Sequence, residues 1–191
     1  NLIIKILQVS LAVFIFSASS FANEVNLYSG RHYDSDEKLY AKFTAETGIK
    51  VNVISGKGKA LMQQIITEGS SSPADLFVTV DAGNLWKAQK EGLFHKITSS
   101  KVDNTVPANL RGPNNEWVAL AKRARIMYYN PRTVSSAELE GLSYEDLAKP
   151  EWNGRVVIRK SSNMYNQSLV SSLVANHGVE ETEAWAKGLV S

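Results

Sequence analysis

A histidine and a tyrosine that stand side by side, His32 and Tyr33, have the clearest ligand-binding chemistry in this sequence. Residues 25–36 read VNLYSGRHYDSD, a short apolar run, a glycine turn and a Ser/Asp cluster typical of a helix start. An imidazole nitrogen and a phenol oxygen on the loop between a strand and a helix form half of a site for a hard, oxygen-preferring ligand. The rest of the chain must supply the other half.

A second tyrosine, Tyr165, has the same setting in residues 161–168, SSNMYNQS, where a strand runs into a polar loop and a helix. Phenolate is a hard anionic donor, and a helix N-terminus favours a negative group by about 0.3 to 1 kcal/mol. The pKa of a tyrosine phenol is ordinarily about 10, so a hard trivalent cation such as ferric iron is one ligand that would hold phenolates at neutral pH. Tyrosine is also common on half-buried loops, so the spacing alone is compatible with tyrosines that pack against the protein and bind no metal.

Several other polar residues could support such a site. Arg31 could accompany an anion or offset phenolate charge, and Arg123 and Arg125 are further conceivable anion partners. Asp81 reads first as a helix cap, although a position at the carboxyl end of a strand could also line a ligand cleft. Neighbouring Tyr128 and Tyr129 would face opposite sides of a strand, so we expect them to pack rather than bind.

Alternating strands and helices must position these residues. Apolar periodicity and glycine punctuation predict three strand–helix units, which is typical of an α/β domain with a parallel sheet. Ligands bind beyond the carboxyl ends of such strands, where residues 30–33 and Asp81 fall. The expected strands are 25–28, 49–53 and 74–80, and the expected helices begin near Ser35, Leu61 and Asp81 and end before Gly48, near Ile66 and at Gly92.

The second half of the chain has a weaker pattern. After a connector at 94–115, strands are predicted at 117–120 and 126–129, with a basic stretch between them that suggests a crossing between two lobes. A short helix near Tyr144, a strand at 155–158 and helices at 164–176 and from Val179 follow. The predicted domains are lobe I at 23–122 and an incomplete lobe II at 123–191.

Residues 1–22 have one charge, Lys5, then an apolar core and small residues, which is typical of a secretory signal peptide. The alternative, a membrane anchor, is disfavoured because the core at 6–16 is shorter than the roughly 20 residues that a span needs. Because the sequence starts at Asn1 and stops at Ser191 within an apolar, helix-like run, we expect it to be a fragment.

Composition excludes several classes of function. Without Lys5 the 21 lysines and arginines become 20, against 19 acidic residues, and this balance gives no support for a nucleic-acid partner. The absence of cysteine excludes thiol catalysis and cysteine-based zinc sites. Neither a GxSxG elbow nor an HExxH pair is present, so we expect a binding protein rather than an enzyme.

Taken together, several motifs resemble the periplasmic ferric-ion-binding proteins of bacterial ABC-type iron importers. The resemblance implies a two-lobed, type II periplasmic-binding-protein-like α/β fold, here with a truncated second lobe, that holds Fe³⁺ between the lobes and delivers it to a membrane permease. It implies His32, Tyr33 and Tyr165 as metal ligands, completed by a later Tyr-Tyr pair that this sequence does not reach. The motifs are LYSGRHY, FTAETGIKV, SPADLFVTVDAGNLW, KRARIMYYN and LSYEDLAKPEWNGRVVIRKSSNMYNQSLV.

We therefore expect an exported, monomeric iron carrier, with or without a synergistic anion such as carbonate. Arg31, Arg125 and Asp81 are candidates for contacting that anion or for supporting the metal ligands. A carrier of the same architecture for an oxyanion or a polyamine is the nearest alternative. An oxyanion site would use backbone N–H groups and Ser/Thr at helix N-termini, and a polyamine site would use acidic and aromatic residues. A secreted α/β hydrolase is a more remote alternative.

Overall fold

The computed structural model describes residues 23–190, so the predicted signal peptide at 1–22 lies outside the described residues. The chain divides into two compact units, of which the first ends at Val80 and the second begins at Asp81. The lobe boundary predicted at 122/123 stays a prediction. Within the described range, every helix is too short or too polar to cross a membrane.

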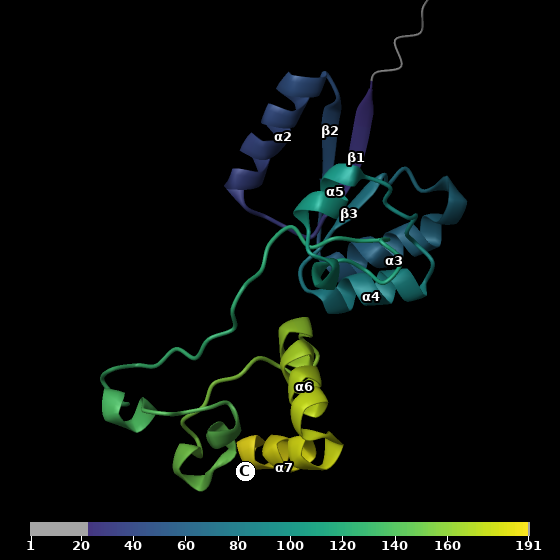
Figure 1. The fold of residues 1–191 in the computed structure, drawn as a ribbon. Coiled ribbons are helices and arrows are strands. Elements are labelled where there is room, and N and C mark those ends of the chain that lie inside the picture. Colours follow the sequence, from purple (N-terminus) through teal and green to yellow (C-terminus); the bar gives the residue numbers. More distant parts are fainter. Residues whose placement is uncertain (1–22, 191) are drawn as a thin grey trace, which may run out of the picture. The chain divides into compact units, whose positions relative to one another are not determined.

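The first unit is built on a parallel sheet of three strands in the order β2-β1-β3. The central strand β1 (Glu24–Ser29) pairs along its whole length with β2 (Lys50–Ser55) and at its carboxyl end with β3 (Leu76–Val78). Helix α2 (Asp34–Thr47) contacts β2, helix α3 (Gly58–Glu68) contacts β1, and a 3-10 turn (Gly69–Ser71) follows α3 (Figure 1). The predicted strand–helix alternation is confirmed.

Local signals explain these elements. Leu27 and Tyr28 on β1 are buried, and Leu61 on α3 is buried too. Gly48 ends α2 in the left-handed conformation with φ 72°, which glycine adopts without a steric penalty. Strand β3 is shorter than the predicted 74–80 because its ladder with β1 covers three residue pairs, and Leu76 is 54% exposed rather than buried on both faces.

The second unit is mainly helical. Its α-helices are α4 (Ala82–Lys90), α5 (Ser100–Thr105), α6 (Met164–His177) and α7 (Val179–Val190). Between α5 and α6 lie the 3-10 helices η2 (Ala108–Leu110), η3 (Ser136–Leu139), η4 (Glu145–Ala148) and η5 (Pro150–Trp152). The predicted helix near Tyr144 is thus a 3-10 turn, and the two predicted C-terminal helices are confirmed.

The core of this unit lies where α6, α7 and η4 meet. Leu173 of α6 and Trp185 of α7 are buried, and the indole nitrogen of Trp185 donates to the carbonyl oxygen of Tyr144 at 2.7 Å. Because buried indole N–H groups need an acceptor, this bond satisfies Trp185 while fixing η4 against α7.

The strands predicted at 117–120, 126–129 and 155–158 are not formed within the described residues. Only an isolated antiparallel bridge, between Arg111 and Val118, is present in the first of these segments. A strand needs a neighbouring strand for its backbone hydrogen bonds, and residues 126–129 and 155–158 pair with no strand in the described part of the chain. Tyr128 and Val157 are accordingly 89% and 100% exposed, so the packing role expected for Tyr128 is not seen.

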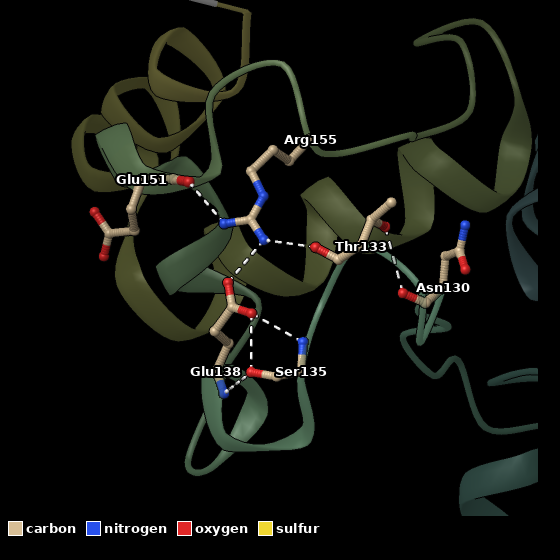
Figure 2. A network of polar contacts seen from close by, with 6 residues as sticks. All are labelled: Asn130, Thr133, Ser135, Glu138, Glu151 and Arg155. Carbon is tan, nitrogen blue, oxygen red and sulfur yellow. Dashed lines mark hydrogen bonds and ion pairs between the residues drawn. The ribbon is translucent and has the colours of Figure 1, made fainter.

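A polar network around Arg155 holds the segment between Asn130 and Arg155 together (Figure 2). The guanidinium of Arg155 donates to a carboxylate oxygen of Glu138 at 2.7 Å and to the carbonyl oxygens of Thr133 and Glu151. It also lies 4.7 Å from the ring centroid of Trp152. Glu138 in turn accepts from the backbone N–H and hydroxyl of Ser135, which forms a capping box at η3.

This network predicts an acid-sensitive contribution to stability. Hydrogen bonds from Ser135 and then Arg155 lower the pKa of Glu138 from 4.5 to about 2. Because the folded-state pKa is depressed, the contribution is complete above about pH 4.5 and disappears as the pH falls toward 2. We expect Glu138→Gln to lower the unfolding temperature of the natural full-length protein at neutral pH, with a difference from wild type that closes over this window.

Thermal unfolding followed by circular dichroism at pH values from 7 to 2 tests this. The matched control is Glu140→Gln, which changes an exposed carboxylate outside the network. A Glu138→Gln difference that is the same at every pH would show that the charge of Glu138 does not carry the effect.

Candidate metal centre

The loop after β1 presents His32 and Tyr33 in the first unit. Strand β1 ends at Ser29, and α2 begins at Asp34 with Tyr33 at its N-cap. The Tyr33 backbone is extended (φ −101°, ψ 132°), and its carbonyl oxygen accepts from the N–H of Asp36 at 2.9 Å. The sequence prediction of a tyrosine directly before a helix is therefore confirmed.

Arg31 fixes this loop to the first turn of α2. Its Nε and one terminal nitrogen each donate to a different carboxylate oxygen of Asp36 at 2.8 Å, and its backbone N–H donates to the hydroxyl of Ser29 at 3.2 Å. The hydrogen bond between them raises the pKa of Arg31 and lowers the pKa of Asp36. A two-point bond of this kind restrains both position and orientation. Arg31 is thus engaged in supporting the loop.

The two candidate donor side chains are stacked and open to solvent. The rings of His32 and Tyr33 are 5.1 Å apart at an angle of 22°, and the Arg31 guanidinium carbon lies 5.0 Å from the Tyr33 ring centroid. Tyr33 is 45% exposed. Its phenol makes no capping hydrogen bond to α2. Both donors can therefore reach an incoming ligand.

Tyr165 lies in the first turn of α6, in the second unit, and is half-buried. The side-chain oxygen of Asn163, the N-cap residue, accepts from the backbone N–H of Tyr165 at 3.0 Å. The amide nitrogen of Asn166 donates to the carbonyl oxygen of Arg159 at 3.0 Å, and that of Gln167 donates to the carbonyl oxygen of Ser161 at 3.1 Å. The polar residues of SSNMYNQS thus hold the preceding loop against the helix start.

Guanidinium groups surround Tyr165. Arg123 donates to its phenol oxygen at 2.9 Å, and Arg125 donates to its backbone carbonyl oxygen. The guanidinium carbons of Arg123, Arg125 and Arg159 lie 5.3, 5.8 and 5.2 Å from its ring centroid. Sequence reasoning named Arg123 and Arg125 but missed Arg159. The available signal was its position directly before the SSNMYNQS loop.

Asp81 is the N-cap of α4, as the sequence predicted. Its carboxylate oxygen Oδ1 accepts from the backbone N–H of Gly83 at 3.0 Å and from the hydroxyl of Ser168 on α6 at 2.7 Å. Ser168 is three residues beyond Tyr165, so Asp81 contacts the helix that carries the second tyrosine. Sequence reasoning had no means of finding this partner, which is 87 residues away.

These residues form two distinct groups of different charge. Arg31, His32 and Tyr33 lie together beside an acidic helix turn, whereas Tyr165 lies among arginines. The first group suits a cation, and the second suits an anionic donor or an anion beside it. Tyr33 and Tyr165 belong to different units, so their joint use in one site stays a prediction. Among the described residues no cluster of three or more His, Asp or Glu side chains could hold a metal, which leaves tyrosine oxygen as the distinctive donor.

Curated proteins of known name match most of this chain. Iron uptake protein A1 of Synechocystis sp. is 54% identical over 168 residues, which are 88% of this chain and 46% of that protein. The Fe(3+)-binding periplasmic protein of Serratia marcescens is 33% identical over 172 residues, which are 90% of this chain and 50% of that protein. The chain spans about half the length of the curated relatives it matches.

Solved structures of iron-binding proteins also match most of this chain. The Trichodesmium protein IdiA (FutA), in complex with iron and citrate ligands, is 53% identical with a TM-score of 0.79, and the match covers 87% of this chain and 52% of that one. A ferric binding protein from Campylobacter jejuni is 42% identical with a TM-score of 0.80, over 86% of this chain and 52% of that one.

The fold and the family follow from these matches. The predicted type II periplasmic-binding-protein-like α/β fold is confirmed over the part that this chain covers. The sequence profile described as bacterial extracellular solute-binding protein matches residues 29–168, which is most of the chain. The chain therefore belongs to the family of bacterial extracellular solute-binding proteins.

Proposed function

We propose that the protein carrying this chain is the periplasmic substrate-binding component of an ABC importer, which captures ferric iron and delivers it to a membrane permease. His32, Tyr33 and Tyr165 are the ligands that this chain contributes. The protein acts as a monomer, is exported by the signal peptide at 1–22, and binds iron without transforming it chemically. Lobe I at 23–122 and the start of lobe II at 123–191 would close on the metal.

One observation supports the proposal most strongly: both candidate tyrosines occupy helix starts, and at least one guanidinium group lies against the ring of each. Phenolate is a hard anionic oxygen donor, which matches a hard trivalent cation better than it matches sugars, peptides or polyamines. Relatives whose names state iron or ferric binding support the same cargo. On binding, each phenol would exchange its proton for the metal, so capture releases protons.

An anion is proposed as a second component of the site. Arg123, Arg125 and Arg159 place positive charge beside Tyr165, where a carboxylate or carbonate could bind next to the metal. Citrate accompanies iron in the Trichodesmium structure, which makes an anion of this chemistry reasonable. Arg31 is engaged with Asp36 and is proposed to support the Tyr33 loop instead.

A ferric titration of the natural full-length protein tests the proposal. We expect a visible phenolate-to-iron charge-transfer band in wild type and a weaker, shifted band in Tyr33→Phe, because one phenolate donor is lost. Tyr40→Phe is the control, because Tyr40 lies within α2, beyond the loop that carries Tyr33. This substitution should leave the band unchanged.

The same cluster of arginines also suits a carrier that binds an oxyanion alone, which is the second candidate. That function would give no charge-transfer band and an unfolding temperature unmoved by iron. It would instead give stabilisation by an anion such as citrate or carbonate without any metal.

A further inference from the structure

We infer that Asp81 and Ser168 position Tyr165 to bind iron. The turn at Asp81 contributes no metal ligand but holds the helix that carries one. This inference rests on the proposed function. It concerns how the ligand on α6 is held in place, which the sequence and the family match leave open.

The hydrogen bond between the two residues is the first observation. Oδ1 of Asp81 accepts from the hydroxyl of Ser168 at 2.7 Å, and the same oxygen caps α4 by accepting from the N–H of Gly83 at 3.0 Å. Both bonds are partly shielded from solvent. A single carboxylate oxygen thus joins the start of α4 to the first turns of α6, and a bond to a charged acceptor is stronger than a neutral one.

The backbone of Asp81 is the second observation. It adopts φ 71° and ψ 134°, a conformation that residues other than glycine rarely occupy. Such a conformation persists when its surroundings enforce it, and here the two hydrogen bonds of the side chain do so. The strained turn aims the carboxylate at Ser168.

A second contact involves Met164, the residue before Tyr165. A Cβ atom on Gly83 would lie 2.6 Å from the sulfur of Met164, so the hydrogen-only side chain of Gly83 admits Met164 in its present position. Met164 directly precedes Tyr165, and Ser168 follows it by three residues on the same side of the helix. The turn at 81–83 therefore contacts one face of α6 at two points, one before and one after the candidate ligand in the sequence.

Two contacts at one helix start restrain both the rotation of α6 about its axis and its shift along that axis. Donor atoms of a metal site must be held within about 0.5 Å, and residues outside the ligand set provide that restraint. Without the Asp81–Ser168 hydrogen bond, the phenol oxygen of Tyr165 would be held less accurately in the position that binds the metal.

The test compares two serine-to-alanine variants of α6 in the natural full-length protein. Ser168→Ala removes the hydroxyl that Asp81 accepts from, whereas Ser172→Ala removes an exposed hydroxyl one turn further along the same helix. We expect Ser168→Ala to weaken ferric iron binding by about 10- to 100-fold and to shift the phenolate-to-iron band. Ser172→Ala should match wild type in both measurements.

Two substitutions at Asp81 complete the experiment. Asp81→Gly permits the positive φ but removes the carboxylate, so it should reproduce the Ser168→Ala effect. Asp81→Asn retains an acceptor oxygen and should restore most of the affinity and the band position. If Ser168→Ala and Ser172→Ala had the same iron affinity and the same band position, the inference would be overturned. A charge-transfer band in the wild-type protein would still support the proposed function in that case. Absence of the band in wild type would overturn the proposed function, and the inference with it.

Discussion

Replacing Tyr165 by phenylalanine in the natural full-length protein is expected to lower its affinity for ferric iron by more than about 100-fold, since loss of residues merely supporting ligands already weakens metal sites by 10- to 100-fold. The substitution removes one oxygen and keeps the ring that the three arginines surround. It therefore isolates the donor atom from the packing of the first turn of α6. The charge-transfer band should weaken and move, because its energy depends on the phenolates bound to iron.

Tyr128→Phe is the matched control, since Tyr128 is 89% exposed and was predicted not to bind iron. Affinity measured by competition with a chelator should be unchanged in this variant. If Tyr165→Phe retained wild-type affinity and the wild-type band, Tyr165 would not be a ligand. The arginine cluster would then be better explained as an anion site alone.

Replacing Trp185 by alanine is expected to lower the free energy of unfolding by about 3 to 5 kcal/mol, the usual range for a buried aromatic residue. Trp185 is 8% exposed and lies in the core that α7 shares with α6 and η4. Its removal leaves a cavity in that core. It also leaves the Tyr144 carbonyl oxygen without the indole N–H that donates to it at 2.7 Å.

Denaturant unfolding of the natural full-length protein measures this effect, with Trp86→Ala as the control. Trp86 is 54% exposed and contacts Lys90 through its ring face, so its loss should be much less destabilising. Equal destabilisation by the two substitutions would contradict the view that the α6–α7–η4 core stabilises this part of the chain.

The positions of the candidate ligands along the chain could be predicted from sequence because the signals are local. The short apolar run before Gly30 and the Ser/Asp cluster after Tyr33 define a strand, a turn and a helix start, and the structure has β1 and α2 at those places. Asn163 does the same for Tyr165 by capping α6. Capping and glycine conformations depend on a few neighbouring residues, so one sequence suffices to find them.

Strand formation in the second half could not be predicted in the same way. Residues 126–129 and 155–158 have the composition of strands, but pairing depends on a partner that is distant in sequence, and the described residues provide none. Arg155 instead donates to Glu138 and to two carbonyl groups, a network that links three separate turns.

The sequence by itself determined the residue types that make this a candidate iron site, His32, Tyr33 and Tyr165, and the local elements that present them. Only the tertiary structure decided which side chains support them. Arg123 donates to the Tyr165 phenol oxygen across 42 residues of sequence, and Asp81 accepts from Ser168 across 87. Caps and turns are fixed by adjacent residues, whereas these two contacts exist only after segments distant in sequence have packed together.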